Sequence, residues 1–430
     1  MILKAIRFSE PNQPATLGAR HSRVDQGPMM SESSVLVSSS EEADSRKGWQ
    51  VVGGVHALTA VTFGSAYAFS AVFPGLSLEF AASRGEIALA FSISAFVFYS
   101  LGAIAGPLAD LWSPRGLIVA GLIAMIVGYI GASRTHSLGS LYLWYGAGVG
   151  LGIGLSYVPA LGAVQSWFVL KRSRASGIAT AGLGLGTLAL PFAVGRLVPD
   201  LGWRGSFVAL AGVIAAVGLP AAMLVRKRQD GSIPSGSRSI RYPSPFAAWR
   251  NRQFRLFYVM LILVSFCTFI PYVHIVPAAR DMGLSLESGT MLIGLIGIGN
   301  IFGRLVLVGL GDRIGALRLL AILTFAVAGS FILWFVAGGI IVLALFAVLF
   351  GMSYGGCVGL YPAVAADLFG ASHIGTMLGY LYTAVGVAAL LGPTVTGFIF
   401  DRTGSYLGPI VFSMTAAIAA GFLTLQLRHK

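Results

Sequence analysis

The chain has 430 residues, of which 56% are hydrophobic and only 10% are charged, and its mean hydropathy is +0.81. Soluble globular domains contain about 45–50% apolar and about 25% charged residues, so this composition excludes a soluble fold and indicates an integral membrane protein. The formal net charge of +13 is therefore evidence about membrane topology, and we do not expect nucleic-acid binding. Both cysteines lie inside apolar runs, so neither a disulfide framework nor a thiolate metal site is expected.

The N-terminal residues 1–47 are rich in Ser, Pro, Glu and Arg, and their apolar start is too short for a signal-peptide core. This composition predicts a disordered cytoplasmic tail. From Trp49 onward, apolar stretches long enough for a helix of about 20 residues to cross a bilayer alternate with short polar breaks. We expect twelve spans, near residues 50–77, 86–109, 116–133, 140–166, 174–198, 204–225, 254–279, 288–311, 317–336, 338–364, 374–399 and 407–427.

The long polar stretch 226–253 divides these spans into six and six. We therefore predict an all-α membrane protein with an N-terminal six-helix bundle at 48–225, a cytoplasmic linker at 226–253 and a C-terminal six-helix bundle at 254–430. Placing both termini in the cytoplasm puts most lysines and arginines inside, as the positive-inside rule requires. We expect a multi-pass protein of the plasma or inner membrane, in contact with lipid. All seven tryptophans fall at or near predicted helix ends, as an interfacial aromatic belt requires.

The two halves carry related loops after their second helices. The first loop contains Gly106, Asp110 and Arg115, and its counterpart in the second half contains Asp312 and Arg313. An aspartate at a helix end beside an arginine can form charge-assisted bonds that latch helices together. These residues resemble the loop between helices two and three of the major facilitator superfamily, which implies a transporter built from two six-helix repeats and a gating role for the loop.

A second stretch, GLGIGLSYVPALGAVQSWFVLKRSRASGIATAGLGLG at 150–186, is similar to the helix four to five region of the monocarboxylate transporters and the neighbouring oxalate/formate antiporters. In those families a Tyr-x-Pro is followed by Trp or Tyr with Phe, a basic loop and a helix rich in Gly and Ala. The glycines of this stretch lie within apolar helices, so we expect them to allow close helix packing and to bind no cofactor.

Arg304 is the one basic residue that we place well inside a predicted span, near the bilayer midplane. An intramembrane charge costs roughly 2.5–3.5 kcal/mol on insertion scales and usually marks a functional path. The acidic residues near the spans lie at their ends, so a structural ion pair is the less favoured alternative. A guanidinium with no internal anion can hold a carboxylate through two parallel hydrogen bonds.

Other polar side chains near this depth are candidates for substrate binding. Asn300 lies one helical turn before Arg304 on the same face, and it can form hydrogen bonds but cannot carry a proton. Tyr157, Tyr354 and Tyr382 could each place a hydroxyl at the same depth, although each could equally be a packing residue.

Two histidines are candidates for proton coupling, because histidine changes its charge between about pH 5 and 8. His274 lies toward the outer part of its helix between Pro271 and Pro277, which can interrupt helical hydrogen bonds and admit water. His56 in the first span is the weaker candidate. For both residues the alternative is a hydrogen-bonded histidine of the core.

The resemblance and Arg304 together predict a secondary transporter of a small monocarboxylate, with a proton as co-substrate and alternating access around Arg304. The rival interpretations are an organic-anion exchanger or exporter of a larger acidic metabolite and, from another class, a non-transporting membrane receptor. An enzyme is not expected, because the histidines are scattered and no nucleophile, base or metal ligands converge in the spans. Neither a cofactor nor a metal ion is expected.

Overall fold

The computed structural model describes residues 45–111, 113–168, 172–228, 245–369 and 374–427, and every regular element in them is helical. The tail predicted for 1–47 lies outside the described residues up to residue 44, and the first helix already begins at Arg46. Residues 229–244 of the predicted linker also lie outside them. The two bundle boundaries therefore stay predictions.

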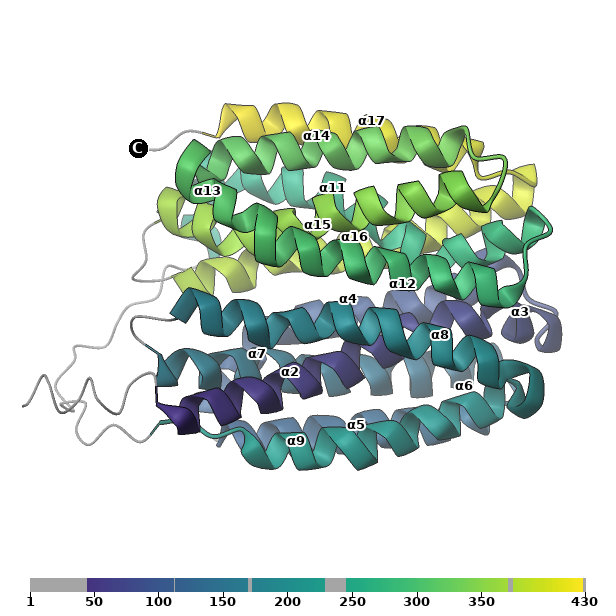
Figure 1. Ribbon diagram of the computed structural model, residues 1–430, viewed down its shortest axis with the longest axis horizontal. Helices are drawn as coiled ribbons and strands as arrows, with labels where there is room; N and C mark the ends of the chain where they lie inside the picture. Colours follow the sequence, from purple (N-terminus) through teal and green to yellow (C-terminus); the bar gives the residue numbers. More distant parts are fainter. Residues whose placement is uncertain (1–44, 112, 169–171, 229–244, 370–373, 428–430) are drawn as a thin grey trace, which may run out of the picture. The chain divides into compact units, whose positions relative to one another are not determined.

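The helices form two groups (Figure 1). The first group contains α2 (Arg46–Tyr67), α3 (Phe69–Glu79), α4 (Arg84–Leu111), α5 (Pro114–Ser133), α6 (Leu138–Leu141), the π-helical η1 (Tyr142–Val149), α7 (Gly150–Trp167), α8 (Arg172–Val213), the π-helical η2 (Ile214–Gly218) and α9 (Leu219–Leu224). The second contains α10 (Pro245–Arg250), α11 (Arg252–Asp281), α12 (Leu286–Phe302), the π-helical η3 (Gly303–Leu307), α13 (Val308–Ile314), α14 (Ala316–Phe335), α15 (Ile340–Phe369), α16 (Ile374–Thr403) and α17 (Leu407–Gln426).

Among the described residues, 11 helical runs are long and apolar enough to cross a membrane. One of them, Ala175–Leu224, has 50 residues, which at 1.5 Å per residue is more than twice the thickness of a hydrocarbon core of about 30 Å. Gly202 breaks this run, because its φ of 64° and ψ of 179° are not helical. The run therefore crosses twice, which accounts for the twelve predicted spans and confirms the all-α membrane fold.

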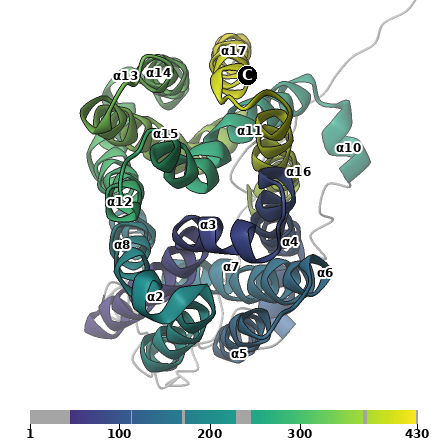
Figure 2. The same cartoon turned by 90° about the vertical axis from the view of Figure 1, so that its right-hand side faces the viewer.

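The long helices run between the same two ends of the molecule. We call the end at the left of Figure 1 the near end, and it contains the start of α2, the start of α11 and the end of α17. The opposite end, which we call the far end, contains the turns at 80–83, 134–137, 282–285, 336–339 and 404–406. Figure 2 looks onto the far end and shows α8 beside α12 on one side and α4 beside α16 on the other. These two helix pairs form the seams between the groups.

Glycines allow the closest helix contacts. A Cβ atom on Gly186 of α8 would collide with the Ala60 carbonyl oxygen of α2, and one on Gly182 would collide with the His56 carbonyl oxygen. At the seam with α12, a Cβ on Gly297 would lie 2.7 Å from the Gly184 carbonyl oxygen. Backbones that pass this closely leave no room for any side chain, so the prediction that these glycines serve helix packing is confirmed.

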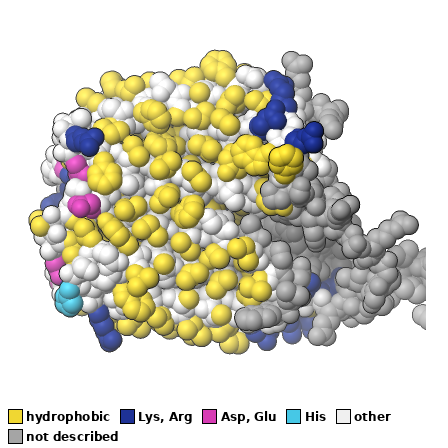
Figure 3. All heavy atoms as spheres, turned by 180° about the vertical axis from the view of Figure 1, so that it is seen from behind, with side chains coloured by type: hydrophobic (Ala, Val, Ile, Leu, Met, Phe, Trp, Pro, Cys, Tyr) yellow, Lys and Arg dark blue, Asp and Glu magenta, His cyan; other side chains and the backbone are white. Residues whose placement is uncertain are grey.

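The surface is apolar over the middle of the helices. Large hydrophobic side chains such as Ile123 in α5 (50% exposed) and Ile322 in α14 (55% exposed) point outward. On the face shown in Figure 3, hydrophobic side chains cover the middle and the described charged side chains lie toward the two ends. An exposed apolar surface of this extent requires lipid contact.

The described tryptophans lie close to helix ends, as predicted, and Trp112 lies outside the described residues. At the near end, Trp167 donates a hydrogen bond of 2.7 Å to the Arg226 carbonyl oxygen. At the far end, Trp203 donates one of 2.6 Å to the Glu79 carboxylate. Each indole thus packs against apolar helix surface while its N–H meets a polar group, as expected at a membrane–water interface.

We predict that Gly186→Ala lowers the melting temperature of the protein in detergent, because the added methyl group must push α2 away from α8. Overpacking of this kind costs typically about 1–3 kcal/mol. The matched control is Gly53→Ala, since a Cβ on Gly53 meets nothing within 4 Å. The control should retain or slightly raise the melting temperature, because Ala is favoured over Gly within a helix by up to about 1 kcal/mol. Equal behaviour of the two variants would contradict the packing argument.

Candidate functional site

Arg304 lies in η3, the π-helical turn that follows α12. Within the run Leu286–Ile314 it stands roughly two-thirds of the way from the far end, so it lies closer to the near end than the sequence-based midplane position. A π-helical turn widens the helix by one residue and is found frequently at functional sites. The apolar sequence around Arg304 contains no pattern that would predict this π-helical turn.

Glycines hold this segment against α15. Cβ atoms on Gly299 and Gly303 would collide with backbone atoms of α15 at Val348 and Met352. In return, a Cβ on Gly355 of α15 would lie 2.5 Å from the Asn300 carbonyl oxygen. The backbone that carries Asn300 and Arg304 is therefore fixed by direct contact with a neighbouring backbone.

Asn300 orients Arg304. The Arg304 Nε donates a hydrogen bond of 2.8 Å to the Asn300 Oδ1, as the spacing of one helical turn predicts. Asn300 is buried, and its amide nitrogen has no hydrogen-bond partner. Because Nε is engaged, the two terminal nitrogens of the guanidinium remain for other partners.

Arg304 borders a cavity of roughly 680 Å³, including the part that opens to solvent. Helices of both groups supply its walls, and the predicted Tyr157, Tyr354 and Tyr382 lie in the lining together with Arg304. Asn300 is not in the lining and acts through Arg304. The structure therefore brings together the five residues that the sequence nominated for substrate binding, four of them at the cavity wall.

Arg304 is the sole charged side chain among the described residues of the lining. The ion pairs found in the described part of the chain join Arg84 to Asp281, Arg196 to Glu287 and Arg204 to Glu79, so none of them includes Arg304. Tyr67, Tyr157, Tyr354 and Tyr382 share the cavity lining with Arg304. The guanidinium thus lies in a lining rich in hydroxyl dipoles and has no anionic partner among the described residues.

Sequence reasoning missed the other aromatic side chains of the lining, which are Phe63, Tyr67, Phe98, Tyr99 and Tyr361. A helical spacing was present in the sequence, because Phe63 and Tyr67 are four residues apart and Tyr354 and Tyr361 are seven apart. This spacing is equally typical of a packed core, so it could not by itself mark a cavity wall.

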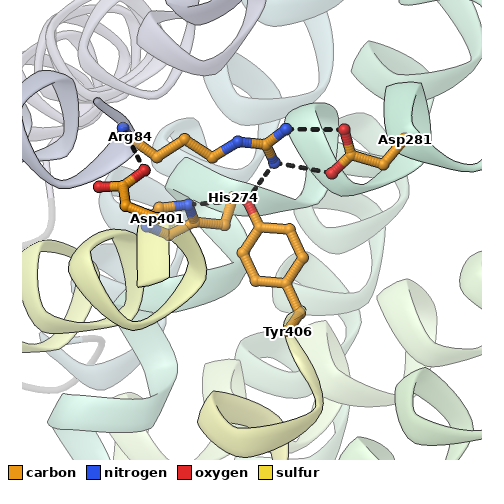
Figure 4. Close-up of polar contacts among 5 residues, drawn as sticks. All are labelled: Arg84, His274, Asp281, Asp401 and Tyr406. Carbon is orange, nitrogen blue, oxygen red and sulfur yellow. Dashed lines mark hydrogen bonds and ion pairs between the residues drawn. The ribbon is translucent and has the colours of Figure 1, made fainter. Parts of the chain in front are cut away.

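His274 lies at the far end, outside the cavity lining, in a cluster with Arg84, Asp281, Asp401 and Tyr406 (Figure 4). Arg84 pairs with both oxygens of Asp281, at 2.6 and 2.7 Å, and donates to the Tyr406 hydroxyl at 2.7 Å. Its backbone N–H donates to Asp401 at 2.8 Å. Because Arg84 begins α4 while its partners lie in α11, in α16 and just before α17, the cluster joins the two helix groups.

The hydrogen bonds of this cluster define the histidine tautomer. The His274 Nε2 lies 2.8 Å from the Pro393 carbonyl oxygen, which can only accept, so Nε2 carries a hydrogen. In the neutral ring, Nδ1 then accepts from the Tyr406 hydroxyl at 3.2 Å. Burial raises the pKa of the Tyr406 hydroxyl, which consequently keeps its proton for this bond. The prolines do not interrupt the helix, since α11 is continuous from Arg252 to Asp281.

The remaining predicted residues lie elsewhere. His56 places Nδ1 2.7 Å from the Ile178 carbonyl oxygen of α8, at a helix contact and not in the cavity lining. Arg115 donates to the Val225 carbonyl oxygen at 3.2 Å, and Arg313 is exposed. The surroundings of Gly106 and the side chains of Asp110 and Asp312 are outside what the structure describes, so the gating loop stays a prediction. In the part of the chain that was described, no group of three or more His, Cys, Asp or Glu side chains could hold a metal ion.

Twelve membrane crossings in two groups, with one charged side chain in the described lining of a cavity between them, are typical of a membrane transporter. Residues 55–393 match the family model of the Major Facilitator Superfamily, and the chain belongs to this family. The protein is accordingly a membrane transporter and not an enzyme.

The chain is similar to monocarboxylate transporters, as the sequence predicts. It is 27% identical to monocarboxylate transporter 11 of Homo sapiens over 393 residues, which cover 88% of this chain and 83% of the relative. It is also 27% identical to monocarboxylate transporter 13 of Rattus norvegicus, over 92% of each chain. The fold resembles a bacterial homologue of the human lysosomal transporter Spinster in an inward-facing, unoccupied conformation, with a TM-score of 0.68 and 16% identity over 90% of this chain and 99% of that one.

We predict that Arg84→Gln and Asp281→Asn each lower the melting temperature, and that the double variant loses less than the sum, because both changes break one contact. The interaction should be on the order of 1 kcal/mol, since Arg84 is only 21% exposed and the pair is bidentate. The control cycle is Arg196→Gln with Glu287→Gln, whose side chains are 63% and 55% exposed and should interact by less than about 0.5 kcal/mol. Additive melting temperatures in the first cycle would refute the far-end contact.

Proposed function

We propose that the protein carries a small monocarboxylate across the membrane by alternating access around Arg304. The observation that carries the proposal is the guanidinium that borders a cavity between the two helix groups with no anionic partner among the described residues. A bound carboxylate would supply that anion through two parallel hydrogen bonds to the terminal nitrogens. The similar proteins reported above are named monocarboxylate transporters, which supports the same substrate class.

The charge of the cavity favours one carboxylate over two. A dicarboxylate would bring a second negative charge into a low-dielectric space whose described lining offers no second cation, and an unpaired buried charge is strongly unfavourable. The cavity is therefore suited to a monoanion.

The proposal also specifies which parts of the protein move and how the protein is oriented in the membrane. Residues 48–225 and 254–430 act as two bundles that rock about the Arg304 cavity, and the near end faces the cytoplasm of a plasma or inner membrane. The distribution of lysine and arginine supports this orientation. In the conformation of this structure, the far-end cluster around Arg84 and His274 holds the two helix groups together at the far end.

Electrostatics and the far-end cluster support proton coupling as part of the proposal. A carboxylate that crosses with H⁺ avoids moving net charge against roughly 2.3 kcal/mol per 100 mV. A proton added to the His274 Nδ1 would convert this atom from acceptor to donor, so its bond from Tyr406 would have to reverse. It would also place a second positive charge near Arg84, whose partners are Asp281, Asp401 and Tyr406. Protonation of His274 would thus loosen the far end.

Counterflow of labelled carboxylates into proteoliposomes, with and without a pH gradient, tests the proposal. Carboxylate counterflow without any effect of the pH gradient would favour the organic-anion exchanger. Binding without counterflow would favour a non-transporting receptor. Selective flux of larger acidic metabolites would favour the exporter.

We predict that Arg304→Gln abolishes carboxylate binding, measured as substrate-induced thermal stabilisation, because it removes the one charged group of the described lining. Arg304→Lys should bind weakly at best, since an ammonium cannot form the bidentate pair. The matched control Arg196→Gln removes an arginine at the far end and should bind like the wild type. Stabilisation by a carboxylate that persists in Arg304→Gln would exclude Arg304 as the binding residue.

We predict that His274→Gln flattens the pH dependence of uptake measured between about pH 5 and 8 while it preserves counterflow at constant pH, because glutamine forms hydrogen bonds but does not titrate. His136→Gln, at an exposed far-end turn, is the control and should retain the wild-type profile. An unchanged profile in His274→Gln would show that the proton travels on the substrate or another group. Loss of counterflow would show a structural role instead.

A further inference from the structure

Aromatic rings dominate the wall of the Arg304 cavity. On the side of the first helix group, Phe63, Phe98 and Tyr157 form a triad in which every pair of rings is T-shaped. Their centroids lie 5.1 to 5.9 Å apart and their planes are inclined by 76° to 83°. The triad therefore offers ring edges and ring faces side by side, which is the arrangement that another aromatic ring prefers to meet.

The second helix group continues this wall. Tyr382 of α16 packs edge-on against Tyr99 of α4 with centroids 6.2 Å apart, so an aromatic contact bridges the seam between the groups. Toward the far end, Tyr67 of α2 stacks on Tyr272 of α11 at 4.2 Å. Because Tyr67 lines the cavity and Tyr272 is fully buried behind it, this stack forms an aromatic wall on the far side of the cavity.

Tyr361 provides an observation that points to a ligand. It lines the cavity, and its hydroxyl is buried without a hydrogen-bond partner in the structure. The cavity lining thus holds a buried polar atom that no described group of the protein satisfies.

The lining also limits the charge that a ligand can carry. None of its described residues is acidic, so an ammonium group in the cavity would lose its hydration without gaining a counter-ion. An aromatic amino acid is therefore a poor ligand, although its ring would fit the wall. One carboxylate attached to one aromatic ring satisfies both the guanidinium and the rings.

We propose that the substrate is an aryl monocarboxylate, whose carboxylate pairs with Arg304 and whose ring packs against the Phe63, Phe98 and Tyr157 triad. This inference rests on the proposed function, because it assumes that Arg304 holds the carboxylate. It goes beyond that function by assigning the body of the substrate to the aromatic wall. A short aliphatic acid would leave this wall in contact with water.

The test compares ligands that share a carboxylate and differ in what they present to the wall. Binding is measured by thermal stabilisation and by competition for counterflow at neutral pH, where these acids are ionised. Phenylacetate should bind at least about tenfold more tightly than acetate, since it buries a whole ring. It should exceed cyclohexylacetate, which has similar apolar area but no aromatic face, by about two- to tenfold. Phenylalanine should not compete.

Variants locate the effect on the wall. Phe98→Leu should weaken phenylacetate binding by about two- to tenfold and leave cyclohexylacetate binding within about twofold, because leucine keeps apolar bulk but removes the ring. The control Phe422→Leu makes the same change at a lipid-facing side chain and should leave both unchanged. The comparison of ligands on the wild-type protein needs no variant, so it decides even if Phe98→Leu fails to fold.

The outcomes separate the two proposals. If acetate or cyclohexylacetate binds as tightly as phenylacetate, the aryl assignment is wrong and carboxylate transport stands. If phenylalanine competes as well as phenylacetate, the charge argument is wrong and the assignment falls with it. If no carboxylate binds, or if phenylacetate still binds Arg304→Gln, the proposed function itself is wrong.

Discussion

A guanidinium in the interior of an apolar helix bundle is the constraint on which this structure depends. Removing such a charge from water costs several kcal/mol unless an anion or a set of oriented dipoles replaces the lost hydration. The described part of the protein supplies dipoles, namely the Asn300 amide and the surrounding tyrosine hydroxyls, and supplies no carboxylate. The site is therefore stable enough to fold and yet electrostatically incomplete, which is the condition for binding an anion reversibly.

The packing of the bundle serves this condition. Gly299 and Gly303 on one helix and Gly355 on its neighbour bring the backbones into direct contact beside Asn300. This contact holds the base of Arg304, while the widened π-helical turn carries its side chain to the cavity. The glycine contacts between α2 and α8 fix a facing wall in the same manner. The cavity consequently lies between helices whose backbones touch their neighbours directly, so side-chain movements cannot change the spacing of these backbones.

The sequence predicted what depends on local composition. Hydropathy predicted the twelve crossings. Arg304 was recognisable as a lone arginine in an apolar stretch, and Asn300 followed because it lies one helical turn before Arg304. Hydropathy also placed a polar break between the predicted spans 174–198 and 204–225, where the positive φ of Gly202 ends the helical run, although it could not show that a single residue makes this turn. The far-end cluster was also out of reach, because Arg84, Asp281 and Asp401 look like ordinary loop charges until the fold joins them. The sequence could not predict the aromatic wall of the cavity, because rings of a packed core and rings of a cavity wall have the same helical spacing.

The placement of the tryptophans separates the indole fluorescence of the protein from its cavity. No tryptophan lines the cavity in the described residues, and Trp167 and Trp203 make their polar contacts at the near and far ends. Indole emission therefore reports on the environment at the ends of the helices. In contrast, six of the 14 tyrosines of the sequence line the cavity. A change in tryptophan fluorescence on adding a ligand would accordingly report a change at the helix ends and not direct contact of the ligand with an indole.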